Sequence, residues 1–234
     1  MGLTGGDVEL RVAADPSQAA ELVAEMLAAA ARQGGHVAVS GGSTPRPAYA
    51  RAAETEPDWS AVTLWFADER CVPPDDAHSN YRLVRETLLD GLAHPPIVHR
   101  VRGELPPEEA ALEYDAIGSG LQLDFALLGI GPDGHTASLF PNAPSLDEGE
   151  RAAVVAEPGL EPLVPRVTLT IPVLSSASLV VFLVCVEDKA EAAERALVGG
   201  PRPETPASLV RSERGRTVAV IDRAAASRLE AAAS

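Results

Sequence analysis

The feature that most limits how this chain can fold is its most apolar run, LVVFLVCV at residues 179–186. A strand with one face in water alternates apolar and polar residues, whereas this run is apolar throughout. Continuous apolarity indicates a strand that is covered on both faces. Parallel sheets with helices on either side contain such strands, so the run predicts an α/β fold in which helices enclose a sheet.

Segments with strand and helix patterns alternate along the chain. Strands are predicted at residues 8–13, 36–39, 63–66, 97–101, 125–130, 152–156, 167–171, 179–186 and 218–222. Helices are predicted from Asp15 and Pro16 to the glycines at 34 and 35, and at residues 46–53, 79–92, 106–117, 188–197 and after Arg223. This alternation predicts an open, mostly parallel, doubly wound sheet with helices on both faces and a ligand at the carboxyl ends of its strands.

The length of 234 residues suits one domain with a substantial core and is short for two. No internal repeat, low-complexity tail or obvious linker divides the sequence. We therefore expect a single α/β domain that spans residues 1–234.

The charge balance is strongly acidic, with 34 acidic residues against 19 basic residues and a formal net charge of −15. Such a charge opposes nonspecific attraction to nucleic acid or anionic lipid, so we expect neither as a partner. An anionic ligand would need local positive groups. The chain is expected to be a monomer or a small homo-oligomer.

The N-terminal segment MGLTGGDVEL has neither the basic start nor the apolar core of a secretory signal. No run approaches the roughly 20 apolar residues of a membrane span. Cys71 and Cys185 are far apart in the sequence and lack the spacing of metal ligands. We expect a soluble, cytoplasmic protein with two free thiols.

A glycine-rich loop follows the predicted strand at residues 125–130 and presents Asp133 and His135. Its glycines lack a Cβ and let the backbone approach a ligand closely: Gly129, Gly131 and Gly134. Histidine ordinarily has a pKa near neutrality, so one at the carboxyl end of a strand is a natural proton acceptor for activating water. The same residues also fit an ordinary turn with a solvated histidine.

A second loop, SGGSTP at residues 40–45, lies between a predicted strand and a predicted helix. It places two glycines and two hydroxyls at the helix N-terminus: Gly41, Gly42, Ser43 and Thr44. Free backbone N–H groups and the helix dipole there favour a phosphate, and the absence of a GxxxxGK[ST] motif favours a monoester over a nucleotide. The alternative is a plain connection in which Ser or Thr is an N-cap.

One of the 19 basic residues is a lysine, Lys189, and the others are arginines. Lys189 follows the buried strand and opens a helix, where a positive charge does not help the helix dipole. A compact ammonium on a flexible stem can reach a phosphate as a point charge, so we interpret Lys189 as a ligand-binding residue. Chance survival of one lysine is the alternative.

The segment WFADER at residues 65–70 places Asp68, Glu69 and Arg70 at the carboxyl end of a strand. Arg70 could bind a phosphate or a sugar hydroxyl, and Asp68 could accept hydrogen bonds from hydroxyls. The alternative is a local ion pair of Arg70 with one of the two carboxylates, worth about 1 kcal/mol or less on a surface. We treat the other histidines as structural or solvated: His36, His94 and His99.

Together these segments resemble the 6-phosphogluconolactonase family of the glucosamine-6-phosphate isomerase/deaminase-like group. The resemblance covers nearly the whole chain and rests on blocks that occur in the family's order. These are VAVSGGSTPRPAY at 37–49, WFADERCVP at 65–73, HSNY at 78–81, LLGIGPDGHTASLFP at 127–141, RVTLT at 166–170 and VCVEDKA at 184–190.

The resemblance implies a metal-independent, cofactor-free hydrolase that opens 6-phosphoglucono-1,5-lactone to 6-phosphogluconate in the oxidative pentose phosphate pathway. It implies that His135 is the base. It also implies that the phosphate contacts are Ser43, Thr44, Arg70 and Lys189. The deaminase branch carries an acidic residue in a pattern like DGHIAFNEP, where this chain has Phe140, and the loss of that proton donor favours the lactonase branch. A sugar-phosphate sensor is the remaining alternative, although no segment is spare for DNA binding.

The mechanism that we expect begins with the 6-phosphate in the loop at residues 40–45. His135, oriented by Asp133, takes a proton from the water that attacks C1, and the imidazolium then protonates the departing ring oxygen. Backbone N–H groups of a glycine loop are the expected oxyanion donors. Ser138 is not expected to be a nucleophile, because no G-x-S-x-G motif surrounds it.

Overall fold

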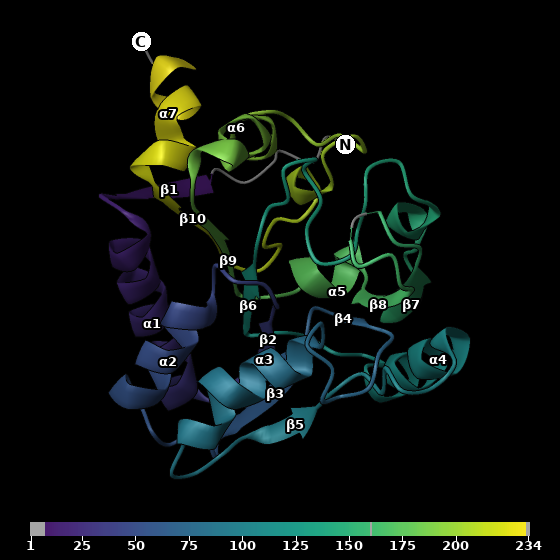
Figure 1. Ribbon diagram of the computed structural model, residues 1–234. Helices are drawn as coiled ribbons and strands as arrows, with labels where there is room; N and C mark the ends of the chain where they lie inside the picture. Colours follow the sequence, from purple (N-terminus) through teal and green to yellow (C-terminus); the bar gives the residue numbers. More distant parts are fainter. Residues whose placement is uncertain (1–7, 160, 233–234) are drawn as a thin grey trace.

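The computed structural model describes residues 8–159 and 161–232. Its main sheet has seven strands in the order β1-β10-β9-β6-β2-β3-β5, and every neighbouring pair is parallel. The strands are β1 (Val8–Ala13), β2 (Gly35–Val39), β3 (Val62–Phe66), β5 (Ile97–His99), β6 (Phe125–Leu128), β9 (Leu179–Val184) and β10 (Arg216–Asp222). The predicted open, parallel sheet is confirmed (Figure 1).

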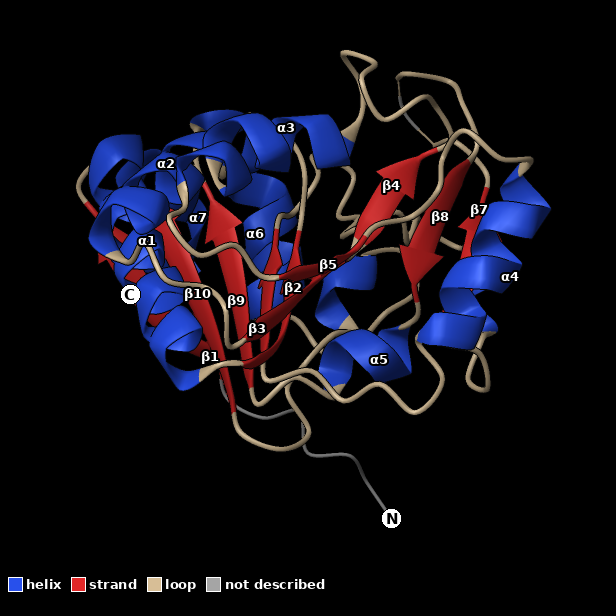
Figure 2. Cartoon of the chain, turned by 90° about the horizontal axis from the view of Figure 1, so that it is seen from below, coloured by secondary structure: helices blue, strands red, loops and turns tan. Residues whose placement is uncertain are grey.

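Helices cover both faces of this sheet (Figure 2). The α-helices are α1 (Pro16–Gln33), α2 (Arg46–Thr55), α3 (Asn80–Thr87), α4 (Pro107–Ile117), α5 (Ile171–Ser175), α6 (Ala190–Leu197) and α7 (Arg223–Ala232). Short 3-10 turns occur at η1 (Leu89–Gly91), η2 (Pro144–Asp147), η3 (Glu187–Lys189) and η4 (Pro206–Ser208). Within the described residues, no helix is both long and apolar enough to cross a membrane.

The core consists of two apolar clusters, one on each face of the main sheet. The first packs α1, α2 and α3 against residues such as Val181 and Leu183 of β9. The second packs α5, α6 and α7 against residues such as Val180 and Phe182 of the same strand. Successive side chains of β9 therefore enter opposite clusters, which is why its sequence is apolar without alternation.

A second sheet of three antiparallel strands begins directly after β3, in the order β4 (Asp68–Arg70), β8 (Arg166–Leu169), β7 (Ala153–Ala156). Helix α4 packs against β7 and β8 (Figure 2). The strands predicted at residues 152–156 and 167–171 thus exist, but they pair with each other and with β4 rather than with the main sheet. β4 was not predicted, because three residues are too few to show an alternating pattern.

Several predicted elements end earlier or begin differently in the structure. β6 stops at Leu128 and β9 stops at Val184, each two residues before the predicted end. The helix predicted at residues 79–92 divides into α3 and η1, and the one predicted at 188–197 begins as η3. The short helix α5 was not predicted.

The chain reverses its direction of travel across the main sheet between β6 and β2. From β2 it proceeds outward to β3 and β5, whereas from β6 it proceeds to β9 and β10 on the other side. The crevice at the carboxyl ends of two such strands is the usual ligand site of an open α/β sheet. The two glycine loops predicted from the sequence follow β2 and β6, so both lie at this position.

Candidate active site

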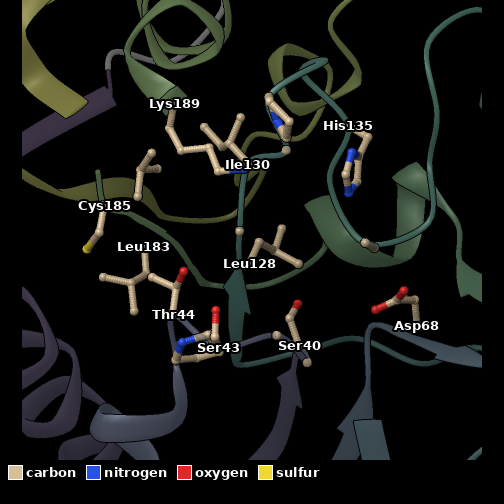
Figure 3. A pocket seen from close by; sticks show the side chains of 18 of the residues that line it. Ser40, Ser43, Thr44, Asp68, Leu128, Ile130, His135, Leu183, Cys185 and Lys189 are labelled. Atoms are coloured by element: carbon tan, nitrogen blue, oxygen red, sulfur yellow. The ribbon is translucent and has the colours of Figure 1, made fainter. Parts of the chain in front are cut away.

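A cavity of about 440 Å³ opens at this crevice, between the glycine loops, the turn after β9 and the edge of the small sheet (Figure 3). It is lined by every predicted site residue except Asp133: Gly41, Gly42, Ser43, Thr44, Asp68, Arg70, His135 and Lys189. Residues from four separate segments of the sequence therefore meet at one place. The other histidines, which we treated as structural, are not among its lining residues.

The imidazole of His135 is oriented by a contact with Asp133, which does not line the cavity. The ring atom Nδ1 lies 2.5 Å from Oδ1 of Asp133, and the backbone N–H of His135 donates to the same oxygen at 3.1 Å. Although burial acts to raise it, the pKa of the Asp133 carboxyl lies below its ordinary value, because these hydrogen bonds and the nearby imidazole favour the charged form. A ring whose Nδ1 donates to a carboxylate keeps Nε2 as its proton acceptor.

The loop geometry explains why a glycine precedes this pair. A Cβ placed on Gly131 would come within 2.0 Å of His135 Nδ1 and 2.8 Å of Asp133 Oδ1. The N–H of Gly131 donates to the carbonyl oxygen of His135 at 2.8 Å, which closes the loop. The imidazole also packs against the Phe140 ring, with 5.0 Å between the ring centroids. The ring of His135 is therefore fixed by close contacts on several sides.

The loop after β2 presents hydroxyls and free N–H groups at the start of α2. Gly42 has φ 97°, a conformation that a glycine adopts without strain. Among the described residues, none accepts a hydrogen bond from the N–H of Gly42, Ser43 or Thr44. The N-cap residue of α2 is Pro45, which makes no side-chain capping bond, so the alternative in which Ser or Thr caps the helix is wrong.

Lys189 lies across the cavity from Ser43 and Thr44, next to Ile130 (Figure 3). It is partly buried at the end of η3. In the part of the chain that the structure describes, its ammonium has no ion pair and no hydrogen bond. An ammonium without an internal partner that faces free N–H groups across a cavity is suited to a phosphate.

Asp68 and Arg70 both line the cavity and do not form the local ion pair that was the alternative, within the contacts of the described residues. Asn80 lies between them, donating from Nδ2 to Asp68 Oδ1 at 3.1 Å and accepting from Arg70 Nη1. The Arg70 Nε is buried and has no partner among the described residues. Both charged groups therefore remain available to a ligand.

Glu69 points away from the cavity and anchors the start of α3. Its carboxylate accepts hydrogen bonds from the backbone N–H groups of Asn80 and Tyr81, each at 2.7 Å, and from the Ser79 hydroxyl at 3.1 Å. Burial raises the pKa of the Glu69 carboxyl to about 7, and the backbone hydrogen bonds oppose that shift. This residue joins β4 to α3 and so fixes the position of Asn80.

The sequence did not show what three polar residues of this region contact. Asn80 was expected only as one of the residues that open a helix and as part of a matching block, and its contact with Asp68 joins segments that no local pattern connects. Ser138 is fully buried and donates from Oγ to Asp68 Oδ2 at 2.5 Å, in agreement with the expectation that it is not a nucleophile.

Arg166 is the third of these residues. It lines the cavity on β8, directly across from Arg70 in the register of the small sheet. Its guanidinium lies 5.4 Å from the centroid of the Phe140 ring. Burial and the nearby Arg70 hold its pKa below the ordinary value. The only signal available in the sequence was the block RVTLT, whose pairing with β4 is non-local.

Both cysteines are free thiols, as expected, and Cys185 lines the cavity at the end of β9. Burial raises the pKa of the Cys185 thiol to about 12, with a further contribution from Asp222. A thiol that is buried and protonated is a poor nucleophile. Cys185 is therefore a poor candidate for covalent catalysis.

Fold and site together define an α/β protein whose switch point carries an oriented imidazole and a loop with free N–H groups. The chain belongs to the glucosamine-6-phosphate isomerase/6-phosphogluconolactonase family, whose model matches residues 13–219. It is 41% identical over 172 residues to a 6-phosphogluconolactonase of Homo sapiens, a match that covers 70% of this chain and 67% of the relative. A 6-phosphogluconolactonase of Thermotoga maritima is 38% identical over 172 residues, covering 71% and 76%.

Solved structures give the same fold. The crystal structure of the Thermotoga maritima 6-phosphogluconolactonase matches with a TM-score of 0.82 at 30% identity, covering 93% of this chain and 100% of that one. A monomeric glucosamine-6-phosphate deaminase matches with a TM-score of 0.80 at 20% identity, covering 94% and 99%. The latter likeness concerns the fold alone.

Proposed function

We propose that this protein is a 6-phosphogluconolactonase, which hydrolyses 6-phosphoglucono-1,5-lactone to 6-phosphogluconate in the oxidative pentose phosphate pathway. The observation that carries the proposal is the arrangement of the cavity. The cavity is lined by the Asp133-oriented ring of His135, by the Ser43–Thr44 loop and, across from that loop, by Lys189 (Figure 3). The relatives named as 6-phosphogluconolactonases support the same reaction.

The substrate's 6-phosphate binds to the side of the cavity formed by the loop after β2. Its oxygens accept hydrogen bonds from the free N–H groups of Gly42, Ser43 and Thr44. The residue before them is a glycine, Gly41, because a Cβ at that position would clash with the Asn80 side chain. Lys189 supplies a positive charge from across the cavity. Arg70 supplies a second cation. These local charges offset the repulsion between a net charge of −15 and an anionic substrate.

The lactone ring then lies near His135. Nε2 accepts a proton from a water molecule whose oxygen forms a bond with C1, and the carbonyl oxygen becomes negatively charged. When the carbonyl re-forms, the bond from C1 to the ring oxygen breaks and the imidazolium returns the proton to that oxygen. The product is the open-chain acid, which ionises to 6-phosphogluconate. Asp133 stabilises the imidazolium and keeps Nε2 directed to the cavity.

Asp68 is positioned to accept hydrogen bonds from sugar hydroxyls. Both of its carboxylate oxygens already accept one neutral donor, from Asn80 and from Ser138, and each oxygen has a second acceptor site. A carboxylate that is held by neutral donors keeps its charge and its orientation for a ligand. We assign it to substrate binding rather than to proton transfer from water.

A deaminase of the same family is the second reaction to consider. That branch requires an acidic group near the position of Phe140, which in this chain is a buried aromatic ring against His135. Phe140 cannot donate a proton to a ring oxygen or an amino group, so lactone hydrolysis is favoured.

A direct assay separates the candidates. Freshly generated 6-phosphoglucono-1,5-lactone should disappear much faster with the protein than in the blank, whereas glucosamine 6-phosphate should release no ammonia. Because the lactone also opens unaided in water, the rate is measured against a blank of the same pH with a His135→Ala variant alongside. Ammonia release without lactone loss would overturn the proposal, and ligand binding with neither activity would indicate a sensor.

We also propose that the function resides in a single domain over residues 1–234 that acts in the cytoplasm on a small molecule. The acidic net charge disfavours nucleic acid as a partner.

A further inference from the structure

Val186 has an unusual backbone conformation at the edge of the cavity. It follows β9, lies three residues before Lys189 and has φ 75° and ψ 152°. That region is essentially restricted to glycine, and a β-branched residue there is strained. Val186 is 49% exposed, so its packing does not offset the strain. Another contact must hold this residue in place.

That contact comes from Asp222, at the end of β10. The N–H of Val186 donates to both carboxylate oxygens of Asp222, at 3.2 Å and 3.1 Å. Asp222 is 2% exposed and also accepts the N–H of Ala225 at 2.8 Å, in the first turn of α7. The Asp222 carboxylate is thus fixed between the end of β10 and the start of α7. From there it holds Val186, which follows the neighbouring strand β9.

The conformation of Val186 sets the direction of the turn that carries Lys189. The N–H of Lys189 donates to the carbonyl oxygen of Val186 at 3.2 Å, so η3 is built directly on the strained residue. A change of Val186 to a negative φ would redirect that carbonyl and the turn after it. Lys189 would then no longer lie across the cavity from Ser43 and Thr44 (Figure 3).

We propose that Asp222 is a positioning residue for Lys189. It holds Val186 in a strained conformation and thereby keeps the ammonium where the substrate's phosphate binds. Asp222 does not touch the substrate, because the cavity is lined by Val186 and Lys189 and not by Asp222. The inference rests on the proposed role of Lys189 in binding phosphate. It assigns to Asp222 a part in selecting a phosphorylated lactone over the same lactone without phosphate.

The test compares Asp222→Ala in two backgrounds, the natural chain and Val186→Gly. In the natural chain, loss of the carboxylate lets Val186 relax, so the competent turn becomes a minor state and KM for the phosphorylated lactone rises by roughly tenfold while kcat changes little. Glycine adopts the same φ without strain, so the turn stays populated without its anchor. The rise in KM caused by Asp222→Ala should therefore be only about two- to threefold in the Val186→Gly background.

Two further readouts separate positioning from a general loss of stability. Hydrolysis of unphosphorylated glucono-1,5-lactone should be unchanged by Asp222→Ala, because that substrate makes no use of Lys189.

Asp15→Ala is the matched control: Asp15 caps α1 by accepting the N–H of Gln18 at 2.9 Å and lies outside the cavity lining. Loss of this cap should lower the stability of the fold with no change in KM. Where Asp222→Ala does not fold, Asp222→Val, which is similar in shape and has no acceptor oxygen, gives the same comparison.

Lys189→Ala distinguishes failure of this inference from failure of the proposed function. If that variant leaves KM for the phosphorylated lactone unchanged, the assigned role of Lys189 is wrong. If Lys189→Ala raises KM, but Asp222→Ala has no effect or an equal effect in both backgrounds, the positioning role of Asp222 is overturned while the function stands.

Discussion

Asp68 and Arg70 lie two residues apart on β4 and carry opposite charges, yet Asn80 occupies the space between them. Its amide donates to the carboxylate and accepts from the guanidinium, so one neutral side chain satisfies both without neutralising either. Without it, the two charges would meet and lose their availability to a ligand. At the residue scale, the site thus depends on side chains that keep reactive groups apart as well as on those groups themselves.

Replacement of Asn80 by Ala should raise KM for the phosphorylated lactone by about tenfold or more, because Arg70 and Asp68 can then pair with each other. Asn80→Asp should be worse, since its carboxylate pairs with Arg70 and repels Asp68. Steady-state kinetics on freshly generated lactone measure both effects. An unchanged KM in Asn80→Ala would show that Arg70 and Asp68 do not need this spacer.

His135→Ala should lower kcat by about 100-fold or more with KM nearly unchanged, as expected when a proton-transfer residue is removed. His94→Ala is the matched control, because His94 is exposed and lies outside the cavity lining. Turnover of His135→Ala within a few-fold of the natural chain would contradict the assigned base.

At the element scale, the buried carboxylate of Glu69 joins β4 to α3 through its hydrogen bonds. This connection between the two elements was not predicted from the sequence. The apolar strands β2, β6 and β9 could be predicted because burial on both faces leaves a continuous apolar run. The two glycine loops could be predicted because they must follow such strands. β4 has three residues, and its partners in β8 are 96 or more positions away in the sequence, so only the fold brings them together.

The raised pKa of Glu69 predicts how this connection responds to pH. Its folded-state pKa of about 7 lies above the ordinary value of 4.5, so the fold favours the protonated form relative to the unfolded chain. The corresponding stabilisation is complete below pH 4.5 and is lost as pH rises to about 7. The free energy of unfolding, compared with that of Glu69→Gln, should fall by about 3 kcal/mol over this range. Urea unfolding at several pH values measures the difference, and a difference that is independent of pH would contradict the shift.

At the scale of the whole molecule, the cavity belongs to two sheets at once. The loops after β2 and β6 and the turn after β9 come from the main sheet, while Asp68, Arg70 and Arg166 come from the small one. The sequence predicted the first group and also Asp68 and Arg70, because each of these follows a recognisable strand. It could not show that residues 166–169 leave the main sheet to pair with β4, so Arg166 was not predicted. Local sequence patterns therefore predict only part of a site that lies between two sheets, because they do not show which distant segments pair.

A ligand that contacts both sheets should stabilise them together. 6-Phosphogluconate at 100 times its Kd should raise the free energy of unfolding by about 2.7 kcal/mol in a single cooperative transition, since it binds only where both sheets are in place. Gluconate and inorganic phosphate at the same concentration are the matched controls, because each fills only one part of the cavity and should stabilise less.

The measurement is thermal or urea unfolding followed by both circular dichroism and tryptophan fluorescence. Trp65, on β3, and Trp59, in the apolar cluster that packs on the main sheet, report on that sheet. Two separated transitions with ligand, or equal stabilisation by phosphate alone, would show that binding does not span the boundary between the sheets.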